Sequence, residues 1–109
     1  MKVLYADTPL RRLVGMLLGR GAGNDECLVL RPCSDIHTLG MRWPIDIAFV
    51  DAVGLVMRSE CGVSPGKRRS CAGAYAVVER RACSSKWVEK GESLRWAVAQ
   101  GKARGGRTV

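Results

Sequence analysis

The chain has 109 residues, of which 47% are hydrophobic and 26% are charged, and this composition is typical of one globular domain with one core. The formal net charge of +8 permits binding to a polyanion, but it equally suits a solvated basic surface. No apolar run reaches the roughly 18 to 20 residues that span a bilayer, and the first residues do not resemble a signal peptide, so we expect a cytoplasmic protein.

The first part of the chain predicts a strand, a helix and a second strand. Lys2–Ala6 alternates apolar and polar residues, as an edge strand does. Thr8 and Pro9 are typical of a helix start, and the leucines that follow recur at helical spacing until Gly19. Glu26–Arg31 is a short apolar run with the length of a buried strand.

The central stretch, residues 36–56, predicts an extended segment, a corner and a β-hairpin. Gly40 permits a positive φ at the corner, and Pro44 keeps the residue before it out of the helical region. Both faces of Ile45–Val50 are mainly apolar, so we expect a central strand there. Asp51–Gly54 is the expected hairpin loop, because Gly54 can supply its left-handed position.

The remainder of the chain predicts shorter elements. In order, these are the returning strand Leu55–Cys61, an exposed basic connection over residues 63–72, the strand Gly73–Glu79, a short helix over Ala82–Trp87, and a final strand that follows a turn at Lys90–Gly91 and ends at Trp96. We expect residues 1–98 to form a single domain and residues 99–109 to form a disordered basic tail.

Several short strands, one clear helix and many turns predict a mainly β (α+β) fold rather than an alternating parallel sheet. We expect a compact antiparallel β-sandwich or a partly open barrel, with one N-terminal helix and a short helix late in the chain.

The residues at positions 36–51 are specific enough to carry a family resemblance. Together with Thr8–Leu17, residues 74–79 and residues 88–94, they resemble the prokaryotic domain of unknown function 192 family over residues 3–96. The resemblance implies a compact, mainly β fold with a helix near the N-terminus, and it implies no activity. The chain departs from the family pattern at Arg80–Cys83, where relatives tend to have an apolar residue followed by Pro-Ala-Gly.

His37, Arg42 and Asp46 are the polar residues of interest in the central stretch. Burying an aspartate in an apolar strand is costly unless it is paired, so we expect Arg42 or His37 to pair with Asp46 and fix the corner. In the alternative interpretation His37 and Asp46 face a cleft, where the imidazole exchanges protons near neutral pH. One histidine and one carboxylate without a nucleophile do not define an enzyme.

The five cysteines predict free thiols rather than a metal or redox site. No two of them have the C-x-x-C spacing that is typical of zinc or disulfide chemistry. Cys33 and His37 are four residues apart, but two ligands are too few to hold a metal ion. We therefore expect no metal and no cofactor.

Three functions remain open. The first, which we favour, is a non-catalytic module that binds a small anionic ligand or a protein partner beside the Gly40–Pro44 corner. Its candidate binding residues are His37, Arg42, Trp43, Asp46, Lys67, Arg68 and Arg69. The second is an electrostatic nucleic-acid binder that uses the basic clusters Lys67–Arg69 and Arg80–Arg81. The third is an enzyme that uses His37 and Asp46.

Overall fold

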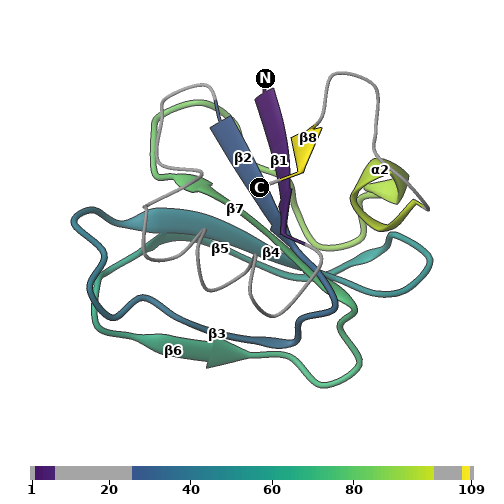
Figure 1. The fold of residues 1–109 in the computed structure, drawn as a ribbon, viewed down its shortest axis with the longest axis horizontal. Helices are drawn as coiled ribbons and strands as arrows, with labels where there is room; N and C mark the ends of the chain where they lie inside the picture. The colour runs from purple at the N-terminus through teal and green to yellow at the C-terminus, as the bar shows by residue number, and fades with distance from the viewer. Residues whose placement is uncertain (1, 7–25, 100–106, 109) are drawn as a thin grey trace.

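The computed structural model describes residues 2–6, 26–99 and 107–108 (Figure 1). Within them lie β1 (Lys2–Ala6), β2 (Glu26–Leu30), β3 (Asp35–His37), β4 (Ile45–Val50), β5 (Val56–Val63), β6 (Arg68–Ser70), β7 (Ala76–Arg81), α2 (Arg95–Val98) and β8 (Arg107–Thr108). The mainly β prediction is confirmed. The helix expected from Thr8 onwards lies outside the described residues. No helix in the described part is long and apolar enough to cross a membrane.

Six strands form one open sheet in the order β5-β4-β7-β2-β1-β8, and β3 pairs with β6 in a separate two-stranded ribbon. The neighbours of β4 and β7 are antiparallel, as expected. The expectation of a wholly antiparallel fold is wrong for β1, which runs parallel to β2 and to β8. Residues 7–25 separate β1 from β2, and they exceed the dozen or so residues that a parallel connection needs.

Strand β4 is the central strand that the sequence predicts. All six of its residues are buried, and it pairs with β5 on one side and β7 on the other. Because successive side chains point to opposite faces, Ala48 and Val50 join one apolar cluster while Ile47 and Phe49 join a second. Both faces of the sheet are therefore covered.

Different segments cover the two faces. Trp87, Leu94 and Ala97, from the segment after β7, pack into the first cluster. Ile36 of β3 packs into the second cluster, so the β3–β6 ribbon lies across that face as a partial second layer (Figure 1). Within the described residues, the two sheets do not close into a barrel.

The β4–β5 hairpin has the predicted loop. Asp51 Oδ1 accepts hydrogen bonds from the backbone N–H groups of Val53 and Leu55, at 3.0 and 2.9 Å. Gly54 has a φ of 95°. A Cβ at this position would lie 2.9 Å from the Cα of Arg95, so the loop also needs a glycine to let α2 approach.

Three expectations for the second half of the chain are wrong. The connection over residues 63–72 contains strand β6, whose side chains are mostly exposed and charged and so lack an apolar pattern. Residues 82–87 form no helix, because the side chain of Arg80 binds the backbone oxygens of Ser85 and Lys86. The turn at Lys90–Gly91 is present, but a single bridge at Ser93 and helix α2 follow it in place of a strand.

Most of the expected tail, residues 99–109, lies outside the described residues. Of that tail the structure describes Ala99 and strand β8, and β8 pairs with Leu4 and Tyr5 of β1. The division of the chain into a domain and a disordered tail stays a prediction.

Candidate functional site on the β3–β6 ribbon

Thr38 holds together the two turns at the end of the ribbon. Its backbone N–H donates to the oxygen of Lys67, and its backbone oxygen accepts from Met41 and Gly66. Its hydroxyl donates to the oxygen of Ser64 at 2.7 Å and accepts from the N–H of Lys67 at 2.8 Å. Thr38 is buried, whereas the residues on both sides of it are exposed. The sequence interpretation missed this role, although a hydroxyl residue between His37 and Gly40 was the available signal.

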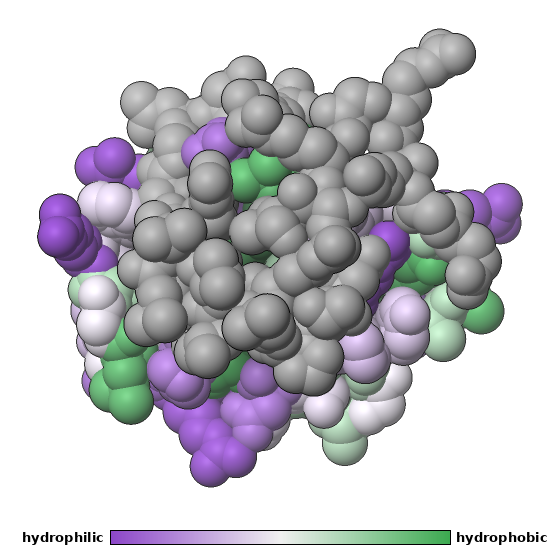
Figure 2. Space-filling view, viewed as in Figure 1, coloured by the Kyte–Doolittle hydropathy of each residue, from purple (hydrophilic) through white to green (hydrophobic). Residues whose placement is uncertain are grey.

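A groove of about 520 Å³ lies beside these turns. It is lined by Asp35, His37, Leu39, Gly66, Lys67 and Arg68. The register of the ribbon places His37 directly opposite Arg68, and Leu39 is 67% exposed. Figure 2 shows a group of hydrophilic residues at the lowest point of the molecule, with apolar residues on either side, in the region where Figure 1 places β3 and β6. The groove therefore combines exposed charge with an exposed apolar side chain.

Two of the three cations in the predicted basic cluster are already paired. Arg68 binds both carboxylate oxygens of Asp35 through Nε and Nη2, at 3.1 and 2.5 Å. This hydrogen bonding lowers the pKa of Asp35 and raises that of Arg68. Arg69 binds both oxygens of Glu60, at 2.9 and 3.1 Å, and its hydrogen bonds are the main cause of the lowered pKa of Glu60.

Lys67 and Arg42 differ from these arginines. Both are exposed, and neither takes part in an ion pair within the described part of the chain. Lys67 lines the groove, whereas Arg42 does not. Lys67 is therefore the cation that the groove offers to a ligand.

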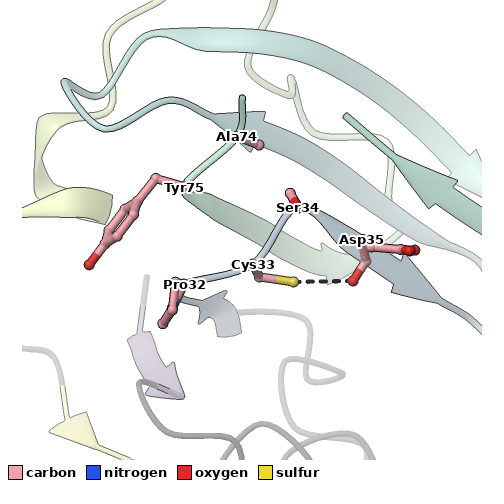
Figure 3. Close-up of a pocket in the computed structure, with 6 residues that line it drawn as sticks. All are labelled: Pro32, Cys33, Ser34, Asp35, Ala74 and Tyr75. Carbon is pink, nitrogen blue, oxygen red and sulfur yellow. Dashed lines mark hydrogen bonds between the residues drawn. The ribbon is translucent and has the colours of Figure 1, made fainter. Parts of the chain in front are cut away.

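A second hollow, of about 340 Å³, adjoins the start of β3 (Figure 3). It is lined by Pro32, Cys33, Ser34, Asp35, Ala74 and Tyr75. The thiol of Cys33 donates to the backbone oxygen of Asp35 at 3.2 Å, and the ring of Tyr75 points away from Asp35. Asp35 lines both hollows, whereas its partner Arg68 lines only the groove of about 520 Å³.

Asp46 is buried, but the expectation that Arg42 or His37 pairs with it is wrong. Its Oδ2 accepts from Arg80 Nε at 2.8 Å, because the β4–β7 register places Asp46 directly opposite Arg80. Its Oδ1 accepts from the N–H of Gly62 at 2.9 Å, at a β-bulge of β5 where Gly62 has a φ of 67°. The carboxylate thus joins three strands and is only 1% exposed.

Arg80 also holds the segment that follows β7. Its guanidinium lies 4.6 Å from the centre of the Trp87 ring and donates to the backbone oxygens of Ser85 and Lys86. The indole N–H of Trp87 in turn donates to the oxygen of Ile47 at 3.0 Å. Arg80 is therefore buried and links β4 to the segment that follows β7. Of the second basic cluster only Arg81 is exposed.

The candidate binding residues consequently fall into separate groups. The ribbon brings His37, Lys67 and Arg68 together in one groove. Asp46 lies in the sheet, bound to Arg80, and Trp43 is half-buried under the guanidinium of Arg81, at 4.6 Å from its ring centre. The proposed cooperation of His37 with Asp46 therefore finds no support in the geometry.

The described residues contain no cluster of three or more histidine, cysteine or carboxylate side chains that could hold a metal ion. Cys27, Cys61, Cys71 and Cys83 have free thiols. Cys27 is fully buried, and its burial raises the pKa of the thiol to about 12, so it is a poor nucleophile.

Glu79 is a buried ionisable residue that the sequence interpretation missed. It lies on β7 and is 6% exposed, and burial raises the pKa of its carboxyl to about 7. The available signal was an acidic residue at the end of the apolar run Ala74–Val78.

Comparisons with known proteins identify a family and similar folds, but they give no activity. A model of the DUF192 family, described as uncharacterized, matches residues 1–96. A protein of unknown function from Novosphingobium aromaticivorans DSM 12444 has a similar structure, with 22% identity and a TM-score of 0.60 over 72% of this chain. The match spans 61% of that protein's length.

A candidate transcription regulator from Sinorhizobium meliloti 1021 is also similar, with 17% identity and a TM-score of 0.62. This match covers 73% of the present chain and 67% of the Sinorhizobium protein. At these identities the two likenesses concern the fold alone. No curated protein matches the chain significantly.

Proposed function

The chain belongs to the DUF192 family, which carries no assigned activity, and we propose that it is a non-catalytic binding module whose ligand occupies the groove on the β3–β6 ribbon. The observation that carries this proposal is the exposure of Lys67 and His37 beside Leu39 in one groove of about 520 Å³. Thr38 fixes both turns that form the groove, so little conformational entropy is lost when a ligand binds.

The chemistry of the groove suits an anion that carries an apolar group. Lys67 offers a charge that no carboxylate in the described part neutralises, and Leu39 offers apolar contact. Both a small organic carboxylate and an acidic side chain of a partner protein have this combination. Catalysis is a weaker candidate, because the groove presents one imidazole while its carboxylate, Asp35, is held by Arg68.

Electrostatic binding to nucleic acid is the second candidate, favoured by the net charge of +8. Of Arg42 and the two basic clusters, Lys67, Arg42 and Arg81 would contribute to it, since Arg68, Arg69 and Arg80 are paired with carboxylates. Such binding weakens steeply as salt is added, because phosphate contacts release counterions.

An NMR titration of the labelled protein tests the first candidate. Hexanoate is the probe, while acetate lacks the apolar group and hexanol lacks the charge. We expect hexanoate to shift the amide signals of residues 35–40 and 66–68, and Lys67→Gln to weaken this binding. Lys90→Gln is the matched control, since Lys90 is exposed and outside the groove. Equal binding by both variants, or shifts confined to other residues, would exclude the groove.

A DNA duplex titrated at low and high salt tests the second candidate. Binding that disappears with salt and depends on Arg42 and Arg81 would favour nucleic acid over the groove ligand. No binding at low salt would remove nucleic acid from consideration.

A further inference from the structure

We propose that Glu79 carries a proton in the folded protein and acts as a proton-linked switch, so that its ionisation loosens the central sheet. The residue lies on β7, between β2 and β4, where the register places Leu28 on one side and Ile47 on the other. Both neighbours are buried in the second apolar cluster. Glu79 therefore lies between two apolar neighbours in the middle of the sheet and is only 6% exposed.

No group in the described part of the chain compensates a charge on Glu79. Neither a hydrogen bond nor an ion pair to its carboxylate occurs there. Arg80 follows it directly, but its side chain lies on the opposite face and is bound to Asp46. An ionised carboxylate that is buried without a partner costs free energy, whereas a protonated one costs much less.

The charged and titratable groups near Glu79 do not change this conclusion. On its own face β7 carries Arg81, which stacks on Trp43, and β2 carries Glu26, whose charge would oppose ionisation. Cys27 of β2 is on the opposite face and keeps its proton, with a pKa of about 12. From β4, Asp46 likewise lies on the opposite face, where Arg80 neutralises it. On the same face as Glu79, beyond Ile47, Glu60 of β5 is bound to Arg69 of the ribbon.

The sign of the pH effect follows from these facts. Burial raises the pKa of Glu79 from 4.5 to about 7, so the folded state binds the proton more tightly than the unfolded chain does. The contribution of Glu79 to stability is therefore fully present below pH 4.5 and is lost as the pH rises to about 7, where the folded protein must lose the proton. Above that range the loss is complete. This is opposite to the usual behaviour of a paired carboxylate, which stabilises a protein as the pH rises.

The effect reaches the candidate binding site through packing. Val77 is the next residue of β7 that points to the same face as Glu79, and it shares the second apolar cluster with Ile36 of β3. The ribbon therefore rests on the face whose packing weakens when Glu79 ionises.

Urea denaturation of the wild-type protein and of Glu79→Gln between pH 5 and pH 8 tests this proposal. The glutamine is nearly isosteric and cannot ionise, so the difference between the two proteins isolates Glu79 from His37 and other titrating groups. We expect the unfolding equilibrium constant to rise about 70-fold more in the wild type than in the variant over this range. Glu89→Gln is the control, because Glu89 is exposed, and its pH profile should parallel that of the wild type.

Carbon-detected NMR of the wild type with labelled glutamate provides a second measurement that needs no variant. The Glu79 carboxyl signal should titrate near pH 7, whereas that of Glu60 should titrate below the ordinary range. A Glu79 signal that titrates near pH 4 to 5, or parallel stability profiles for wild type and Glu79→Gln, would overturn the proposal.

Discussion

Replacement of Asp46 by alanine should destabilise the fold by about 3 kcal/mol, at the lower end of the roughly 3–5 kcal/mol that removal of one member of a buried ion pair costs. The change leaves the guanidinium of Arg80, which is 8% exposed, without its carboxylate, and it leaves the N–H of Gly62 without an acceptor. The loss stays at the lower end because Arg80 keeps the oxygens of Ser85 and Lys86 and the face of Trp87.

Urea denaturation followed by circular dichroism measures this loss, and a double-mutant cycle with Arg80→Leu isolates the pair. We expect the double variant to be less destabilised than the sum of the single variants, since each single change leaves one charge buried alone. Asp35→Ala removes an exposed partner of Arg68 and serves as the control, with little change in stability expected. An unchanged denaturation midpoint for Asp46→Ala, or strictly additive effects in the cycle, would refute the claim that the Asp46–Arg80 pair stabilises the fold.

Three further predictions concern the hydroxyl of Thr38, the backbone at Gly54 and the buried thiol of Cys27. Thr38→Val keeps the shape but loses the hydroxyl hydrogen bonds to Ser64 and Lys67, so it should cost about 1–3 kcal/mol in urea denaturation and shift the amide signals of the ribbon. Thr38→Ser should do neither. Gly54→Ala should lower the melting temperature more than Gly40→Ala, because both positions have positive φ but only the first Cβ meets backbone atoms, and equal losses would contradict this steric reasoning. Cys27 should resist a thiol reagent until the protein unfolds, whereas the exposed Cys61 and Cys83 should react at once, as a time course with mass spectrometry would show.

The sequence predicted best those elements whose signal is local. The apolar residues on both faces of Ile45–Val50 predicted a fully buried strand, and Gly54 predicted the left-handed position of the loop. Strand β6 was missed because its residues are charged and mostly exposed, and its pairing with β3 depends on hydrogen bonds that any sequence can make. Helix α2 was missed because four residues are too short to show a helical period.

In the candidate site, too, the sequence predicted local features but not those that depend on strand pairing. The sequence predicted that Asp46 is buried and that a basic residue pairs with it, and both predictions are confirmed. The partner was assigned to Arg42 or His37 because these are near in sequence, whereas Arg80, 34 positions away, is adjacent only through the β4–β7 register. A register of this kind depends on the packing of the whole sheet, so a single sequence does not reveal it.

The placement of Arg80 also changes what the net charge means. A charge of +8 suggests a basic surface, yet several arginines are used inside the molecule or against carboxylates. Arg31 is 5% exposed and donates to the oxygens of Ala97 and Ala99, and Arg80 is bound to Asp46. On the ribbon, Arg68 and Arg69 are held by Asp35 and Glu60. The net charge of +8 already subtracts these carboxylates, so the pairs do not lower it; they determine which cations in the described part of the chain are available to a polyanion. One unpaired lysine beside an exposed leucine suits instead a ligand with a single negative charge and an apolar part.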